Sequence, residues 1–187
     1  MIVPVEVSAR HAHLSEDDFR ALFGHAQLHV LRELSQQGQF AARECVTLSH
    51  EGKVLKNVRI VGPFRGVTQI ELAPTDARSL GYEHLPLKDK HESTGGASIT
   101  LIGPKGSLER HGAFYSKRHL HCDPPSAKEL RRVDGDEVRV RLQGARALIF
   151  EHVIVRVRGD YRFRLHLDTD EGNAAGLTGG EHAEVLQ

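Results

Sequence analysis

The sequence lacks the features that mark several common classes of protein. Its 25 basic and 25 acidic residues cancel, and no basic tract or long acidic run interrupts the chain. Charge therefore gives no support for a nucleic-acid partner or for a charged membrane surface. No apolar run approaches the roughly 20 residues of a membrane-spanning helix, and mean hydropathy is −0.38. We therefore expect no nucleic-acid partner and no membrane span.

Cysteine is also scarce, with Cys45 and Cys122 as the two copies in 187 residues. A small secreted disulfide scaffold usually carries more. The N-terminal stretch MIVPVEVSARH has no charged segment followed by an apolar one, as a secretory signal would. We expect reduced cysteines and a cytoplasmic protein. With 39% hydrophobic residues, the chain is long enough for one ordinary domain or two small ones.

Short stretches with period-two apolar patterning dominate the chain, and turn signals separate them. We expect strands at residues 2–7, 44–48, 54–61, 66–72, 98–102, 107–109, 137–142, 147–150, 152–157 and 162–167. The polar, glycine-rich residues 88–96 are predicted to form a mobile loop. Many short strands at close spacing favour antiparallel barrels or sandwiches over an alternating β/α sheet.

Helix signals are few and short. Ser15-Glu16-Asp17-Asp18 resembles a capping box, and Gly24 ends the helix that it predicts. We expect three more short helices within residues 74–81, 123–132 and 169–176. The fold class predicted is mainly β, with short helices at the ends of the β-rich segments.

One motif occurs twice. The pattern S-x-R-H-x-H stands at residues 8–13 and again at 116–121, each time followed by a short capped helix. We interpret this as two related β-rich modules, each with a histidine pair at a strand end. Because residues i and i+2 of a strand share a face, His11 would face the same way as His13, and His119 the same way as His121.

These histidines are candidate metal ligands, since imidazole nitrogen binds zinc and neighbouring transition metals well. His166, in Leu-His-Leu-Asp on a further strand, is the natural fifth imidazole, with Asp168 as its supporting partner. A single H-x-H in a strand is more often a half-exposed pair, but two copies in matching contexts favour a metal site. The remaining eight histidines are predicted to be surface or packing residues.

Carboxylate and anion-binding residues carry weaker signals. Glu71 and Glu44 both stand in or beside predicted strands, and each by itself is more typical of a solvated strand face. Cys122 is a soft-ligand candidate, but a buried small residue is the favoured interpretation. Arg65 lies in the turn Gly-Pro-Phe-Arg-Gly, where its fork could hold a phosphate. Arg10 and Arg118 would point away from the histidine pairs and are candidates for anchoring the strands.

Longer segments bring a family resemblance into view. The segments that carry it, in order along the chain, are VPVEVSARHAHLSEDD, LSQQGQFAARECVTL, NVRIVGPFRGVTQIEL, SITLIGPKGSLE, RHLHCDP, DGDEVRV and LHLDTDEGNAAGL. Together they cover nearly the whole chain. The sequence resembles the phosphotransacylases, or phosphate propanoyltransferases, of the propanediol-utilization type.

This resemblance implies two antiparallel β-barrels capped by short α-helices. Residues 10–116 would form one barrel, and residues 1–9 would join residues 117–187 in the other. It implies two zinc ions in one active site, where the two S-x-R-H-x-H copies meet. The implied metal ligands are His11, His13, Glu71, His119, His121 and His166. Glu44 stays open as the alternative to Glu71, and Arg65 is the implied catalytic residue, contacting phosphate.

The resemblance also implies an activity, the interconversion of acyl-CoA plus phosphate with acyl phosphate plus CoA, for a propanoyl or acetyl group. No G-x-S-x-G elbow is present, which favours direct transfer over a serine acyl-enzyme. A zinc-dependent hydrolase and a non-catalytic zinc-binding β-protein are the alternatives. Association into a homo-oligomer stays open.

Many members of this family that work in bacterial microcompartments carry an amphipathic N-terminal extension. This sequence starts almost directly with the first predicted strand. A cytosolic enzyme, a microcompartment enzyme directed by another route, and a chain trimmed at its start are all consistent with that difference.

Overall fold

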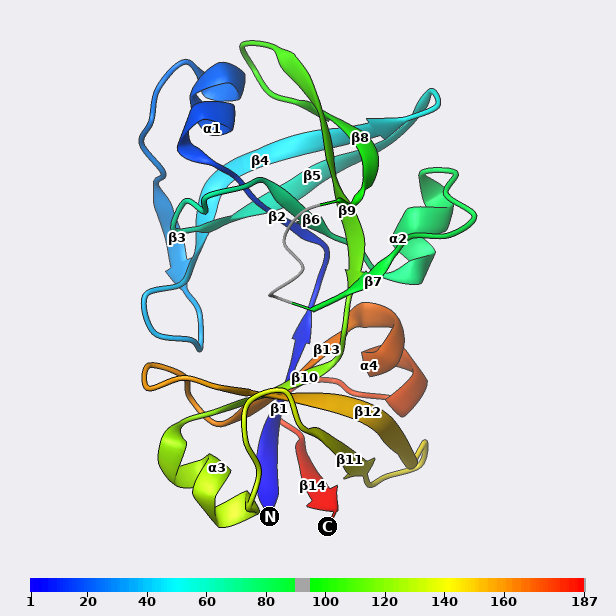
Figure 1. The fold of residues 1–187 in the computed structure, drawn as a ribbon. Coiled ribbons are helices and arrows are strands. Elements are labelled where there is room, and N and C mark those ends of the chain that lie inside the picture. The colour runs from blue at the N-terminus through cyan, green and yellow to red at the C-terminus, as the bar shows by residue number, and fades with distance from the viewer. Residues whose placement is uncertain (90–94, 187) are drawn as a thin grey trace. The chain divides into compact units, whose positions relative to one another are not determined.

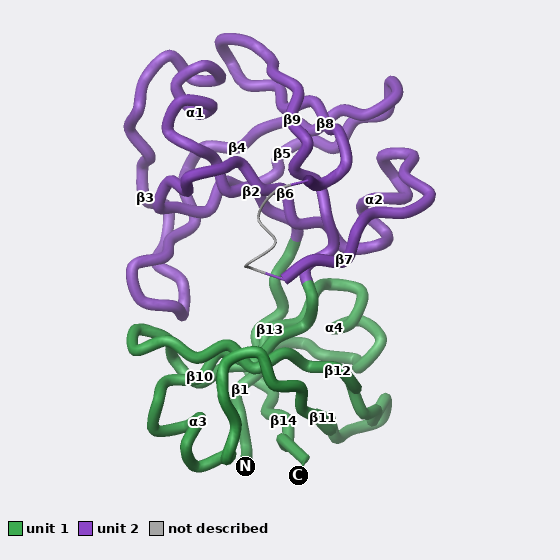
Figure 2. Tube along the Cα trace, viewed as in Figure 1, with its two compact units in different colours: residues 1–9, 117–187 green, residues 10–116 purple. Residues whose placement is uncertain are grey.

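A computed structural model describes residues 1–89 and 95–186, so part of the loop predicted at 88–96 lies outside the described residues. The chain divides into two compact units, residues 1–9 with 117–187 (unit 1) and residues 10–116 (unit 2), as Figure 2 shows by colour. Each unit holds a closed six-stranded barrel and two short helices, and the predicted mainly β fold class is confirmed. Figure 1 labels the elements.

Unit 1 closes its barrel in the order β1-β13-β10-β12-β11-β14. Its strands are β1 Ile2–Ser8, β10 His119–Cys122, β11 Glu137–Leu142, β12 Leu148–Val157, β13 Arg164–Asp168 and β14 His182–Leu186, with helices α3 Pro124–Leu130 and α4 Thr169–Ala175. Alternate residues fill the interior: Val3, Leu120, Val153 and Leu165 are fully buried. The other face of these strands is left for polar side chains.

Unit 2 closes a ring in the order β2-β5-β4-β8-β9-β6. Its strands are β2 His11–His13, β4 Phe40–His50, β5 Lys53–Gly62, β6 Gln69–Glu71, β8 Ala97–Ile102 and β9 Ser107–Ser116; β3 Val30–Glu33 and β7 Leu87–Lys88 pair at the edges, and the helices are α1 Glu16–Phe23 and α2 Pro74–Ser79. Ala12, Ile60, Ile70 and Leu101 are fully buried in its core.

The two barrels have the same topology. In each, the strand that carries the histidine pair lies between a parallel neighbour (β5 or β12) and an antiparallel one (β6 or β13). On its other side, the antiparallel neighbour pairs with a strand that runs parallel to it: β6 with β9 in unit 2, and β13 with β1 in unit 1. Each barrel is therefore mixed, with two parallel pairs, rather than purely antiparallel as predicted. The first strand of each repeat belongs to the other unit, since β1 precedes β2 and β9 precedes β10.

Several strand boundaries differ from the prediction. The two strands expected at 147–150 and 152–157 are one strand, β12, with a bulge where His152 adopts a left-handed φ of 54°. Strand β9 continues well past the predicted residues 107–109. Strand β3 was not expected because all four of its residues are exposed, which leaves no apolar alternation to detect. Strands β7 and β14 were not expected either.

All four expected helices are present; side-chain caps begin α1, α3 and α4, whereas α2 begins after Ala73 without one. The Ser15 side chain accepts a hydrogen bond from the Asp18 backbone N–H at 3.2 Å, and Gly24 ends α1 in a left-handed conformation. Asp168 and Glu171 form a full capping box at the start of α4. None of the helices that the structure describes is long and apolar enough to cross a bilayer.

Candidate metal centres

Unit 1 gathers three histidines on the outer face of its barrel. His119 and His121 lie on β10, on either side of the fully buried Leu120, and His166 on β13 pairs directly with His119. One ring nitrogen from each lies within 4.8 Å of the others. Because directly paired residues of neighbouring strands share a face, the register brings the three imidazoles together.

The orientation of His119 leaves one ring nitrogen for a ligand. Its Nδ1 lies 2.8 Å from the Lys117 carbonyl oxygen, which can only accept, so Nδ1–H is the donor and Nε2 keeps the lone pair. Burial, with Arg156, His166 and His121 nearby, holds the His119 pKa well below its usual range. A neutral imidazole is the form that coordinates metal.

An aromatic side chain that sequence reasoning missed holds the second imidazole of this group. Tyr161, in the loop between β12 and β13, stacks on His121 with ring centroids 3.9 Å apart. The Arg158 guanidinium lies 4.5 Å from the Tyr161 ring centroid. Tyr161 lies in no strand pattern, so its place beside His121 depends on the loop conformation alone.

Unit 2 gathers His11 and His13 from β2 and Glu71 from β6, with one ligand atom from each within 4.8 Å of the others. Glu71 pairs directly with His11. The Glu71 Oε1 atom lies 3.8 Å from His11 Nε2 and 3.9 Å from His13 Nε2. Ligands about 2.1 Å from a tetrahedral ion stand roughly 3.4 Å apart, so these separations are close to those of a zinc ligand set.

His13 is prepared in the same way as His119. Its Nδ1–H donates to the Val61 carbonyl oxygen at 2.9 Å, which leaves Nε2 facing Glu71. Burial is the main reason that its pKa lies well below the usual range, and the nearby Arg65 and His11 lower it further. In both units a backbone carbonyl thus selects the ring nitrogen that is offered, as at many protein metal sites.

Of the two candidate glutamates, the structure brings Glu71 into this group. It occupies the position in unit 2 that His166 occupies in unit 1, directly opposite the first histidine of the pair. Glu44 lies on β4, where its carboxylate accepts from His29 Nδ1 at 2.6 Å and from the His29 backbone N–H at 3.2 Å.

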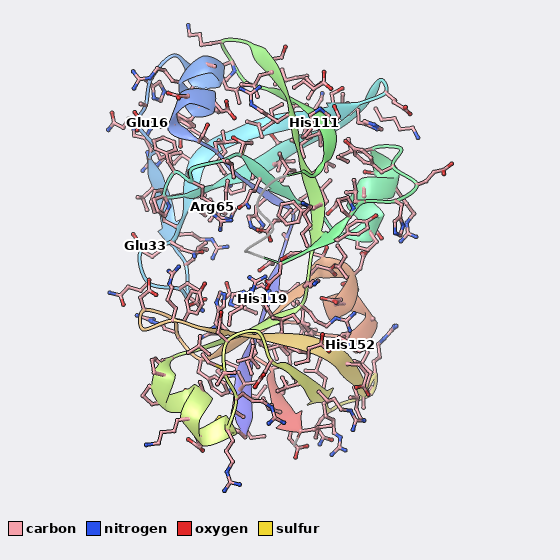
Figure 3. All side chains as sticks on the ribbon, in the orientation of Figure 1. Glu16, Glu33, Arg65, His111, His119 and His152 are labelled. Carbon is pink, nitrogen blue, oxygen red and sulfur yellow. The ribbon has the colours of Figure 1, made fainter. Side chains whose placement is uncertain are left out.

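Arg65 lies in the turn between β5 and β6, labelled in Figure 3. Its backbone N–H donates to the Leu14 carbonyl at 2.9 Å. Its guanidinium donates through Nη1 to the Gln69 side-chain oxygen, and the same nitrogen lies 3.9 Å from Glu71 Oε1. The Arg65 side chain is 37% exposed, and a guanidinium can bind an anion such as phosphate with two parallel hydrogen bonds. Gln69, which pairs with His13, was not predicted as a site residue.

The remaining candidates have other roles. The Asp168 carboxylate, expected to support His166, instead caps α4 by accepting from the Glu171 backbone N–H at 2.8 Å. Cys122 is fully buried in the barrel core, and burial raises its thiol pKa to about 12, which disfavours a ligand role.

The two arginines beside the histidine pairs form equivalent ion pairs. Arg10 donates to Asp76 of α2 at 3.1 Å, and Arg118 lies 2.8 Å from a Glu171 oxygen of α4. Each pair joins a strand end that carries histidines to the helix that follows the third ligand of that unit. Both arginines therefore stabilise the site from outside it.

The donor sets fit zinc in both units. Three imidazoles, or two imidazoles and a carboxylate, are sets that zinc takes, with a further position left open for water or substrate. The lowered pKa values of His13 and His119 provide neutral imidazoles in the buried setting that such sites use. Among the residues that the structure describes, these are the two groups with such spacing.

Comparison with known proteins supplies the family. A sequence profile described as phosphate propanoyltransferase matches residues 4–178. The chain belongs to the phosphate propanoyltransferase family. A phosphate propanoyltransferase from Shewanella putrefaciens is 42% identical over 181 residues, which cover 96% of this chain and 85% of that protein. Phosphate propanoyltransferases from Thermotoga maritima (41%, covering 98% and 88%) and Salmonella typhimurium (43%, covering 93% and 83%) are similarly close.

Membership of the phosphate propanoyltransferase family confirms the resemblance seen in the sequence, and it places the chain in a family of acyltransferases. The profile match spans both histidine pairs, Glu71, Arg65 and His166. Both candidate metal groups therefore lie within the region shared with that family.

Proposed function

We propose that this chain transfers a short acyl group, propanoyl or acetyl, between CoA and phosphate, with two zinc ions held by the two side-chain groups. The observation that carries the proposal is the pairing of Arg65 with the unit 2 group, since its guanidinium lies 3.9 Å from Glu71 Oε1. Family membership supports the reaction class.

In the proposed reaction, a phosphate oxygen attacks the thioester carbonyl carbon, a carbon–oxygen bond forms, and the carbon–sulfur bond breaks to release CoA as thiolate. Arg65 binds the phosphate with its two-pronged fork and aligns it for attack. Gln69 holds that fork in place through its side-chain oxygen. Bound zinc would supply positive charge that stabilises the developing oxyanion and lowers the pKa of the CoA thiol.

The residues around each candidate metal group keep its buried imidazoles neutral, and they exclude bulk water from several of the proposed ligands. His13, His121 and His166 are all buried, with less than a tenth of their surface exposed. We propose that both groups are required for turnover. The chain enters each group within three residues of the point where it passes from one unit to the other, after Ala9 and after Ser116.

Release of free CoA thiol from propanoyl-CoA and acetyl-CoA tests the activity, with and without phosphate and before and after chelation. We expect release that depends on phosphate, is lost on chelation and returns with zinc. Release without phosphate would indicate a zinc hydrolase instead. Tight zinc binding with no release would indicate a non-catalytic zinc protein.

The Arg65→Ala variant tests the role of the arginine. Removing the fork should raise the phosphate KM by about 10- to 100-fold, the range that a lost charged hydrogen bond produces. The acyl-CoA KM and the zinc content should stay unchanged, because Arg65 is not among the proposed ligands. Steady-state kinetics and elemental analysis provide the readouts. Loss of zinc from this variant would contradict the assigned role.

A further inference from the structure

A network of polar side chains outside the candidate ligand set ties down the turn that carries Arg65. Its centre is Asp18 on α1, a carboxylate whose residue is 6% exposed. The Arg110 guanidinium on β9 donates to it twice, from Nε at 3.0 Å and from Nη2 at 2.6 Å. The Thr68 hydroxyl donates to the same carboxylate at 2.5 Å. A buried charge is thereby fully engaged by strong hydrogen bonds.

The Thr68 hydroxyl is both a hydrogen-bond donor and a hydrogen-bond acceptor. Besides donating to Asp18, its oxygen accepts from the Ser15 backbone N–H at 3.1 Å. Thr68 directly precedes Gln69, the residue whose side chain receives the Arg65 guanidinium. Its backbone is also confined, because a Cβ added at Gly112 of β9 would lie 2.8 Å from the Thr68 carbonyl oxygen.

The turn is bonded to three consecutive residues, the last residue of β2 and the two that follow it. His13 bonds the Val61 carbonyl before the turn, and Leu14 accepts from the Arg65 backbone N–H within it. Ser15 donates to Thr68 at its end. The same stretch of chain therefore sets a candidate metal ligand and both ends of the turn that carries the anion-binding arginine.

The other barrel shows that the fold does not require this network. From the paired registers, the positions in unit 1 equivalent to Thr68 and Arg110 are Phe163 and Ile2, which cannot form such bonds. The position equivalent to Asp18, the third residue of its helix, is Ser126. Unit 1 closes the same barrel without the network, so barrel closure alone does not account for it.

We propose that Thr68, held by Asp18 and Arg110, is a positioning residue that fixes the Arg65 guanidinium for phosphate binding. This rests on the proposed role of Arg65. The hydroxyl acts by holding the start of β6, so that Gln69 presents its oxygen to Arg65 in one orientation. Thr68 itself contacts neither substrate nor metal in this proposal.

The test compares Thr68→Val, which keeps the shape and removes the hydroxyl, with Thr68→Ser, which keeps the hydroxyl. Thr68→Val should raise the phosphate KM roughly threefold to tenfold, the factor that one lost hydrogen bond of ordinary strength produces. The acyl-CoA KM and zinc content should not change, and Thr68→Ser should restore the phosphate KM. Calorimetric titration with inorganic phosphate should show the same weakening without turnover. Thr100→Val, on β8 of the same unit, is the matched control and should change neither KM.

A double-mutant cycle separates positioning from a general structural effect. If Thr68 acts through Arg65, then Thr68→Val should add nothing to the phosphate KM of Arg65→Ala. A further increase in that background, a rise in both KM values, or failure of serine to rescue would overturn the proposal.

If Thr68→Val does not fold, Arg110→Lys provides the second test, because lysine lacks the guanidinium fork that donates twice to Asp18. This variant should also raise the phosphate KM. An unchanged phosphate KM in Arg110→Lys would overturn the proposal. An unchanged phosphate KM in Arg65→Ala would overturn the phosphate role of Arg65 and this proposal with it. A normal Arg65 effect with no Thr68 effect would overturn the positioning role alone.

Discussion

At the scale of single residues, strand register determines which side chains join the candidate ligand groups. Glu71 and His166 are different side chains at equivalent positions, each directly opposite the first histidine of a pair. Glu44 has the same charge as Glu71 but lies against His29. Chemistry alone therefore does not select a ligand, since the position in the barrel also decides which groups can share an ion.

Substitutions at the two glutamates test this selection. Glu71→Gln should lower zinc from about two to about one ion per chain, because an amide is a poor ligand in a set of three. Glu71→His, which copies the unit 1 group, should keep about two. Glu44→Gln is the matched control and should also keep about two. Elemental analysis after gel filtration provides the readout, and zinc loss in Glu44→Gln rather than Glu71→Gln would reverse the assignment.

At the scale of elements, helix α1 is joined to strand β9 and to the Arg65 turn by Asp18. Burial raises the pKa of this carboxyl, but hydrogen bonds from Arg110 and Thr68 outweigh burial, so the pKa lies below its usual value. A lowered folded-state pKa means that the charged carboxylate stabilises the folded protein. That contribution is complete above the unfolded-state pKa, about 4, and is lost as pH falls through the folded-state pKa.

The Asp18→Asn variant should show this dependence. At neutral pH it should reduce the free energy of unfolding by about 1–3 kcal/mol, the range for hydrogen bonds to a charged group. The difference from the unsubstituted protein should shrink as pH falls from about 4 through the lower folded-state pKa, at which Asp18 in the folded protein becomes protonated. Urea unfolding across a pH series measures it. The exposed neighbour Asp17→Asn should change stability by less than about 0.5 kcal/mol. A difference that grows in acid would contradict the assigned sign.

At the scale of the whole molecule, one barrel topology occurs twice, and each copy brings together a candidate ligand group within its own unit. Helices and anchoring arginines recur at equivalent positions, and in each unit one histidine bonds a backbone carbonyl, the second of the pair in unit 2 (His13) and the first in unit 1 (His119). The copies differ around the ligand groups. Unit 2 carries Arg65 and its supporting network, whereas unit 1 carries Tyr161 stacked on His121.

Metal removal should therefore affect stability as well as activity. A ligand that binds only the folded state stabilises it, by about 2.7 kcal/mol when free ligand is 100 times its Kd. Chelation should lower the thermal unfolding midpoint, and added zinc should restore it. The combined variant His13→Ala with His121→Ala should unfold at one temperature with or without chelator. A thermal unfolding midpoint of the unsubstituted protein that does not change on chelation would argue against resident metal in both groups.

Several features follow from the sequence alone, because their causes are local. Period-two patterning and turn signals indicated a mainly β chain, caps indicated all four helices, and H-x-H spacing put each histidine pair on one face. Long motifs carried the family resemblance, which the comparisons confirm. The strand, helix and histidine-pair predictions each rest on residues within a few positions of one another.

The tertiary structure decided what depends on distant pairing. The β2–β6 register places Glu71, rather than Glu44, directly opposite His11. The parallel pairing of β1 with β13 joins residues 160 positions apart, as in Val5 with Leu165, and the network around Asp18 joins residues 92 positions apart. Short-range patterns do not encode which strands become neighbours, since side-chain alternation is the same for either partner. Closure of the barrels sets those neighbours, and with them the two ligand groups.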